Sequence, residues 1–109
     1  MPSYSRNDVI LVRYPFTDLM GAKVRPAVVV HAPHPSRDCL VVPLTSRVSA
    51  LQTGEFVLTD WTGAGLHVPS AVKRGISTVH ERHVVKLVGR LTPADAALLD
   101  QSLRQWLGL

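Results

Sequence analysis

The chain has 109 residues, 46% of them hydrophobic and 18% charged, which fits one folded domain over residues 1–109 and leaves too little length for two. A net charge of +4 and a pI of about 9.8 favour RNA, DNA or an acidic protein as partner, although a basic protein without such a partner has the same composition. The single cysteine, Cys39, excludes an internal disulfide, and the lack of a leader or of an apolar run of ~18 residues predicts a cytoplasmic protein with no membrane segment.

The first half of the chain predicts three strands. Residues 9–14 and 24–30 are mostly aliphatic, and the polar loop 17–23 between them joins them into a β-hairpin. A second loop at 32–37 leads to the third apolar run, residues 39–44. These runs supply the apolar part of a sheet.

The second half predicts shorter strands. Residues 55–59 alternate between polar and apolar side chains, as a half-buried strand does, and residues 61–69 are glycine-rich and irregular. The segment 70–79 predicts a weaker strand broken at Gly75, and residues 84–91 predict the last strand.

The C-terminal segment predicts a helix. Thr92 is a suitable N-cap, Pro93 suits the first helical position, and Asp95 is placed to return a capping bond. Gly108 suits the end of the helix. An apolar stripe follows the cap at spacings of three and four: Ala96, Leu99, Leu103 and Trp106. About six strands followed by a helix predict a mostly β fold, a small barrel or curled sheet with the helix packed on it.

Polar side chains stand at the ends of two apolar strands. Arg25 precedes Pro26 at the expected start of the second strand, and a proline there removes one ladder bond and biases Arg25 to extended geometry. Thr45, Ser46 and Arg47 follow the third strand. If these strands pair, guanidinium and hydroxyl groups converge into a phosphate site. The alternatives are an arginine paired with a carboxylate and a Ser/Thr turn that satisfies its own backbone.

These residues carry a family resemblance. The stretches VILVRYPFTDLMGAKVRPAVVV (9–30), VVPLTSR (41–47) and VGRLTPADAALLDQSLRQWLGL (88–109) resemble the MazF/PemK toxins of type II toxin–antitoxin systems. The resemblance implies an SH3-like β-barrel with packed helices, working as a homodimer without metal or cofactor. It also implies sequence-specific cleavage of single-stranded RNA, with attack by the 2′-hydroxyl and products that carry 2′,3′-cyclic phosphate and 5′-hydroxyl ends. The implied partner is a cognate antitoxin with an acidic segment, and operator DNA is expected only through the antitoxin complex.

The resemblance assigns the catalytic roles to Arg25 and Thr45. Arg25 is expected to neutralise the dianionic phosphorane, and Thr45 to hydrogen-bond one of its equatorial oxygens. The proton acceptor is not identified, because the stretch 70–78 contains no carboxylate where some relatives have one. Asp18 and Glu81 are weak candidates for this role.

Basic and loop side chains are candidates for contact with RNA. The basic ones are expected to bind phosphates, and the alternative for them is ordinary solvated charge. Phe16 and Trp61 suit stacking on an unpaired base, although Phe16 equally suits a core position. The candidate contacts are Phe16, Thr17, Asp18, Lys23, Ser46, Arg47, Lys73 and Arg74.

The histidines point to no site. His31 and His34 flank the second loop, and His80 and His83 are three residues apart. Two ligands without a third make a poor metal site, so all four are expected on the surface.

Two other functions fit the same fold. One is a gyrase poison of the CcdB type, and the other is a barrel that binds RNA or an acidic partner without cutting. The missing carboxylate favours the second of these, which predicts RNA binding without a cyclic-phosphate product.

Overall fold

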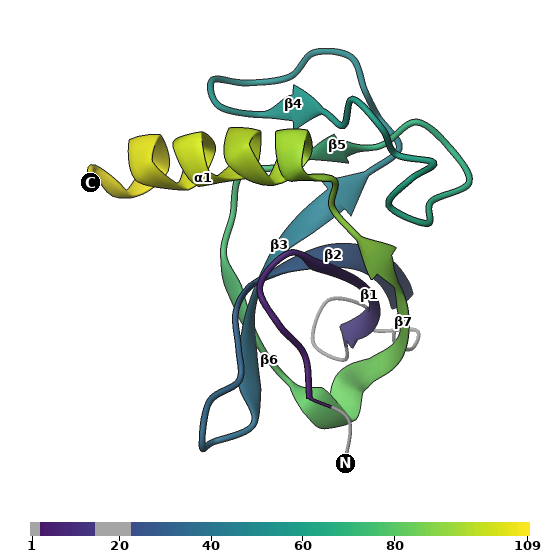
Figure 1. Cartoon of the computed structure of the whole chain (residues 1–109), viewed down its shortest axis with the longest axis vertical. Helices are drawn as coiled ribbons and strands as arrows, with labels where there is room; N and C mark the ends of the chain where they lie inside the picture. The colour runs from purple at the N-terminus through teal and green to yellow at the C-terminus, as the bar shows by residue number, and fades with distance from the viewer. Residues whose placement is uncertain (1–2, 15–22) are drawn as a thin grey trace.

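The computed structural model describes residues 3–14 and 23–109. The fold is an antiparallel sheet with a C-terminal helix packed across it (Figure 1). A 3₁₀ turn, η1 (Glu81–His83), joins the last two strands. The remaining elements are β1 (Asp8–Tyr14), β2 (Lys23–His31), β3 (Asp38–Thr45), β4 (Phe56–Val57), β5 (Ala71–Val72), β6 (Ser77–His80), β7 (Val84–Arg90) and α1 (Pro93–Leu107).

The sheet curls into a barrel-like form without closing. The strand order is β4-β5-β3-β2-β1-β7, and β6 pairs with β3. Figure 1 shows β1, β2, β3, β6 and β7 curling around one another, while α1 lies beside β4 and β5. Within the described strands, β7 pairs with β1 alone, so the barrel stays open on that side. The expected mostly β fold with a packed C-terminal helix is confirmed.

The core lies on both faces of the central strands. In β2 the consecutive residues Ala27, Val28 and Val29 are all fully buried, which requires cover on both sides of the strand. Val28 belongs to a cluster that includes Leu99 and Leu103 of α1. The cluster on the opposite face lies inside the curl and contains Ile10, Val12, Ala27, Val29, Cys39, Val41 and Val79. On β2 the inner cluster extends as far as Ala27, and Arg25, two residues earlier, is exposed.

The observed strands lie where the sequence predicts them, but several differ from the prediction in length. The expected strand 55–59 shrinks to the two residues of β4. The expected break at Gly75 is confirmed, because Gly75 has a φ of +139° and separates β5 from β6, so the described residues form seven strands and not six. Pro26 lies inside β2 and not at its start, because β2 begins at Lys23 and pairs there with β1 alone. Pairing with β3 starts one residue after Pro26, at Ala27.

The helix begins and ends where the sequence predicts, and Asp95 does more than return a capping bond. Thr92 caps α1 by accepting a hydrogen bond from the Asp95 N–H at 3.4 Å, and Gly108 ends it in the left-handed conformation. The fully buried Asp95 carboxylate returns a bond to the cap side chain, accepting from the Thr92 hydroxyl at 3.4 Å, and its shorter bonds go to the loop after β4. It accepts hydrogen bonds from the N–H and hydroxyl of Thr59, both at 2.9 Å, and from the Asp60 N–H at 3.1 Å. Asp95 thus ties α1 to the loop after β4.

Two expectations from the composition, on membrane segments and on the single cysteine, can be compared with the structure. In the described part of the chain, no helix is long and apolar enough to cross a membrane. Cys39 is fully buried, and its burial raises the pKa of the thiol, with smaller contributions from nearby carboxylates, which fits the expected unreactive thiol.

Candidate nucleic-acid site

Arg25 and Thr45 each lie two residues beyond Ala27 and Pro43, the last residues that pair between β2 and β3. The register of these strands pairs Val29 with Val41 and Ala27 with Pro43. The ladder ends at that second pair; the same register, if continued by two residues, would set Arg25 opposite Thr45. Residues directly opposite in an antiparallel pair point to the same face. We call the ends of these two strands, with Arg25 and Thr45, the β2–β3 site.

The β2–β3 site lies at the rim of the inner core cluster. Arg25 pairs across the sheet with Val12 of β1, which is fully buried, whereas Arg25 is exposed. Thr45 is half-buried and pairs on its other side with the buried Ala71 of β5. The apolar neighbours limit the backbone motion of both residues, so a guanidinium and a hydroxyl are held on a stiff support.

The side chain of Thr45 bonds to the backbone of its own turn, which was the expected alternative to a phosphate site. Its Oγ1 accepts a hydrogen bond from the Arg47 N–H at 3.1 Å. A hydroxyl both accepts and donates, and the bond to Arg47 uses only one lone pair. The hydroxyl proton can still be donated to a phosphate oxygen, so the turn fixes the rotamer of Thr45 and leaves its donor capacity.

The surroundings of the site are basic. Lys23, Ser46 and Arg47 are all exposed beside it. Within residues 3–14 and 23–109, the ion pairs of the chain do not include Lys23, Arg25 or Arg47. Two cations on β2 and a third just after the end of the adjacent strand β3 suit a polyanion. Phe16, Thr17 and Asp18, the remaining expected contacts from the first loop, lie outside the described residues.

Glu81 is too far from this site to act there. Its carboxylate accepts a hydrogen bond from Arg37 Nε at 2.9 Å, and the residue follows His80, which pairs with Asp38 at the start of β3. Thr45 is at the other end of β3, seven residues away, which is roughly 20 Å along an extended strand. Glu81 is therefore an ion-pair partner of Arg37 and not a proton acceptor for the β2–β3 site of the same protomer.

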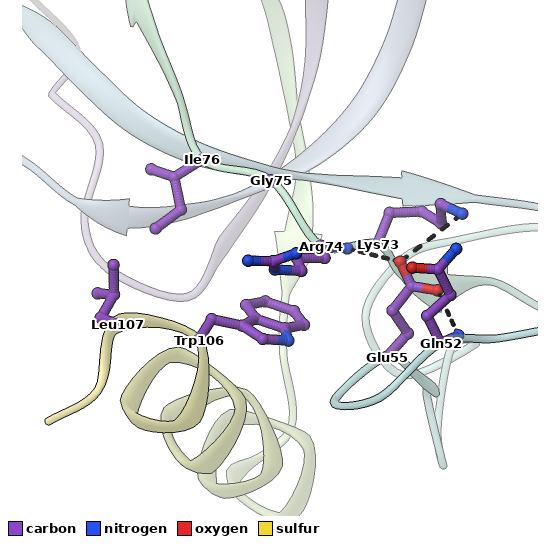
Figure 2. Close-up of a pocket in the computed structure, with 8 residues that line it drawn as sticks. All are labelled: Gln52, Glu55, Lys73, Arg74, Gly75, Ile76, Trp106 and Leu107. Carbon is purple, nitrogen blue, oxygen red and sulfur yellow. Dashed lines mark hydrogen bonds and ion pairs between the residues drawn. The ribbon is translucent and has the colours of Figure 1, made fainter.

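A carboxylate that the sequence did not reveal lies beside Lys73 and Arg74. Glu55 stands just before β4, and its side chain is only 3% exposed. It accepts hydrogen bonds from the N–H groups of Gln52 and Arg74, both at 2.8 Å, and lies 3.6 Å from Lys73 Nζ (Figure 2). The register of β4 with β5 extends to set Glu55 opposite Lys73, an arrangement that the sequence alone did not indicate.

Glu55 is a poor proton acceptor in this arrangement. The hydrogen bonds from the backbone of Arg74 and then of Gln52 lower the pKa of the carboxyl group, and Lys73 lowers it further, whereas burial opposes them. A carboxylate with a depressed pKa binds a proton weakly. Glu55 instead holds the Lys73–Arg74 segment in place. Lys73 is further fixed by its N–H, which donates to the Pro43 carbonyl at 3.0 Å.

The aromatic and histidine candidates lie elsewhere. Trp61 is half-buried and packs against the core cluster under α1, on the opposite face of the sheet from the inner cluster. His31 and His34 have ring centroids 6.4 Å apart, and His80 Nδ1 accepts the Arg82 N–H at 3.0 Å. Across the described ranges, no group of three or more His, Cys, Asp or Glu side chains is arranged to hold a metal ion.

Known structures share this fold. An endoribonuclease in complex with its cognate antitoxin, from a mycobacterial species, matches with a TM-score of 0.77 and 16% identity over 97% of this chain and 96% of that chain. Mycobacterium tuberculosis toxin MazF-mt6 matches with a TM-score of 0.73 and 20% identity over 94% and 97%. A chain of the MazE–MazF structure from Deinococcus radiodurans matches with a TM-score of 0.75 and 16% identity over 100% and 99%.

The sequence itself matches one family. A search of curated proteins gave no match. The profile of the family described as PemK-like, MazF-like toxin of type II toxin-antitoxin system matches residues 5–107, which is nearly the whole chain. The chain therefore belongs to the PemK-like, MazF-like toxins of type II toxin–antitoxin systems.

Proposed function

We propose that the chain is a single-domain toxin, residues 1–109, that acts in the cytoplasm as a sequence-specific, metal-independent endoribonuclease on single-stranded RNA. Its family membership and the solved endoribonucleases of the same fold support this activity. The observation that carries the proposal is that Arg25 and Thr45 lie on adjacent strands, each two residues beyond the Ala27–Pro43 pair. This arrangement joins a fixed cation and a hydroxyl donor in an open, basic site.

The proposed reaction is a transesterification at phosphorus. The 2′-oxygen of a nucleotide forms a bond to the adjacent phosphorus, the bond from phosphorus to the 5′-oxygen breaks, and the 2′ proton leaves to a base. The products are a 2′,3′-cyclic phosphate and a 5′-hydroxyl, which takes up a proton. Arg25 neutralises the phosphorane, and Thr45 donates a hydrogen bond to one of its oxygens.

The remaining candidates are assigned to binding RNA. Lys23, Arg47 and Arg74 are proposed to contact phosphates, together with Lys73, whose charge is partly balanced by Glu55. Ser46, beside Thr45, is proposed to donate a hydrogen bond from its hydroxyl to the RNA. Phe16, Thr17 and Asp18 are assigned to the same surface from sequence alone.

Two protein partners are proposed. The solved relatives include an endoribonuclease in complex with its cognate antitoxin and a MazE–MazF structure. By analogy, the acidic segment of a cognate antitoxin covers the basic β2–β3 site, and operator DNA is bound only through the antitoxin complex. The chain is proposed to act as a homodimer.

The test is cleavage of a long single-stranded RNA in EDTA by the antitoxin-free protein. The wild type is expected to give discrete cuts with cyclic-phosphate ends, and Arg25→Ala is expected to lose roughly 100- to 1000-fold in rate. Thr45→Val keeps the shape of the side chain and removes the hydroxyl, so it should also lose activity. Arg82→Ala is the matched control, because Arg82 is an exposed arginine on η1, at the far end of the sheet.

Each other outcome identifies another function. RNA that is bound but left intact would refute the nuclease and identify a binding module. Trapped, cleaved DNA with intact RNA would identify a gyrase poison. Equal activity of Arg25→Ala and Arg82→Ala would refute the assignment of the β2–β3 site.

A further inference from the structure

A groove separate from the β2–β3 site opens between the end of α1 and the segments that flank β4 and β5 (Figure 2). It consists of two adjoining cavities of about 500 and 590 Å³. Both cavities are lined by Gln52, Arg74 and Trp106. Gln105 lines one of them, and Ile76 and Leu107 line the other. We call this the Trp106 groove.

The indole ring of Trp106 is held rigidly in the groove. Its Nε1 donates a hydrogen bond to the Thr53 carbonyl at 3.0 Å. Gly54 has a φ of +85°, and a Cβ built there would collide with Trp106 Nε1, so the turn passes close to one edge of the ring. Ser102 Oγ donates to the Gly54 carbonyl at 2.6 Å and anchors the same turn to α1. The ring is therefore fixed before any ligand arrives.

The other groups around the ring have the chemistry of base recognition. Figure 2 draws the Arg74 guanidinium and the Trp106 ring on the same groove. Arg74 is exposed and forms no ion pair within the described residues. Gln52 and Gln105 supply amides that both donate and accept, as the edge of a base requires. The one carboxylate of the groove, Glu55, is already occupied by two N–H groups.

We propose that the Trp106 groove binds an unpaired nucleobase of single-stranded RNA, with the base stacked on Trp106 and its phosphate on Arg74. This inference rests on the proposed nuclease function and adds a second contact to it. A rigid aromatic ring beside a cation is the usual platform for single-stranded nucleic acid. An acidic peptide fits the cation equally well, but it gives no role to the two amides.

The groove is close enough to serve the same RNA. Ala71 pairs with Thr45, and Arg74 follows Ala71 by three residues, which is roughly 10 Å of extended chain. Arg74 stands at the bend after β5, so the RNA would continue from the β2–β3 site around this end of the sheet. The groove then selects a base that flanks the cut.

The first test is fluorescence of Trp106. The chain has two tryptophans, so Trp61→Phe leaves Trp106 as the only reporter. The probe is a set of short 2′-O-methyl RNA oligonucleotides, which lack the attacking hydroxyl. Binding is expected to quench Trp106, and an oligonucleotide with an abasic position at the stacked nucleotide should bind without quenching.

Substitutions then separate stacking from structure. Trp106→Leu is expected to weaken binding of these oligonucleotides roughly 10- to 100-fold, the loss of one stacked base. Trp106→Phe loses the bond to Thr53 but keeps an aromatic face, so it should retain most of the affinity. If both variants lose affinity equally, the ring acts through the fold and the inference is wrong.

The outcomes for the groove and for the nuclease are distinct. RNA cleavage that needs Arg25, without quenching of Trp106 by any bound oligonucleotide, would overturn the groove and keep the proposed function. Quenching by RNA without cleavage would support the groove and refute the nuclease. Quenching by a poly-glutamate peptide in place of RNA would overturn the groove as a base site.

Discussion

Replacing Glu55 by glutamine tests whether this buried carboxylate holds the basic segment after β5. The carboxylate accepts N–H groups from Gln52 and Arg74, both at 2.8 Å, and its side chain is 3% exposed. A glutamine has the same shape but only one acceptor oxygen. Its NH₂ group then faces one of the two backbone N–H groups, which loses its partner.

The magnitude follows from these bonds. One hydrogen bond to a charged group is lost, at about 1.5–3 kcal/mol, and the other becomes a weaker neutral one. Lys73 adds little, because its side chain is 43% exposed and solvent screens the pair. The free energy of unfolding should fall by about 3 kcal/mol. For a domain near this size, each 1 kcal/mol lowers Tm by about 4–8 °C, so calorimetry at pH 7 resolves the change easily.

The pH dependence gives a second check. The pKa of Glu55 is lowered in the folded state, so its contribution is fully present above the unfolded pKa of about 4.3 and is lost as the pH falls through the folded pKa. The gap between wild type and Glu55→Gln should therefore narrow in acid. Asp100→Asn is the matched control, since that carboxylate pairs with arginines on the surface, and it should change Tm little at pH 7. A Glu55→Gln protein as stable as the control would refute the reasoning.

Two further predictions concern other buried contacts. Asp95→Ala leaves the N–H and hydroxyl of Thr59 without their acceptor inside the fold, and should lower the free energy of unfolding by about 3 kcal/mol or more, measured by urea denaturation. Gly54→Ala should cost more stability than Gly108→Ala, because both glycines have positive φ but only Gly54 lies against a neighbour, Trp106. Equal losses in Tm for the two alanine variants would contradict the close approach at Gly54.

The sequence predicted the neighbouring strands that carry Arg25 and Thr45 because their pairing depends on local patterns. Two apolar runs joined by a short loop pair as neighbours, so the polar residues just beyond the paired stretch lie at the same end of the sheet. The amino-acid pattern alone was therefore enough to place Arg25 and Thr45 at neighbouring strand ends, and their joint action on a phosphate stays a prediction. Only the position of Pro26 was misjudged, since β2 extends beyond its partner β3.

Glu55 and Asp95 could not be predicted in this way. Glu55 precedes a strand of only two residues, which is too short to show the alternation of polar and apolar side chains that marks a strand in a sequence. Its partner Arg74 is 19 residues away, and Asp95 reaches Thr59 across 36. Both carboxylates accept backbone N–H groups, which every residue except proline has, so no pair of side-chain types signals the contact. The Trp106 groove depends on the same long-range contacts and was missed for the same reason.

The break between β5 and β6 explains how the chain presents Lys73 and Arg74. β3 pairs with β6 through Val41 and with β5 from Leu44 onward, so its partner changes around Pro43. Proline has no N–H to donate at that point, while its carbonyl accepts the Lys73 N–H. A continuous strand would bury this stretch in the ladder. The break instead turns Arg74 out to the Trp106 groove, and Glu55 supplies the acceptor that the interrupted ladder lacks. The irregular segment is thus a consequence of Pro43 and of the bend at Gly75, and it links the sheet that carries Thr45 to the surface proposed to bind the flanking base.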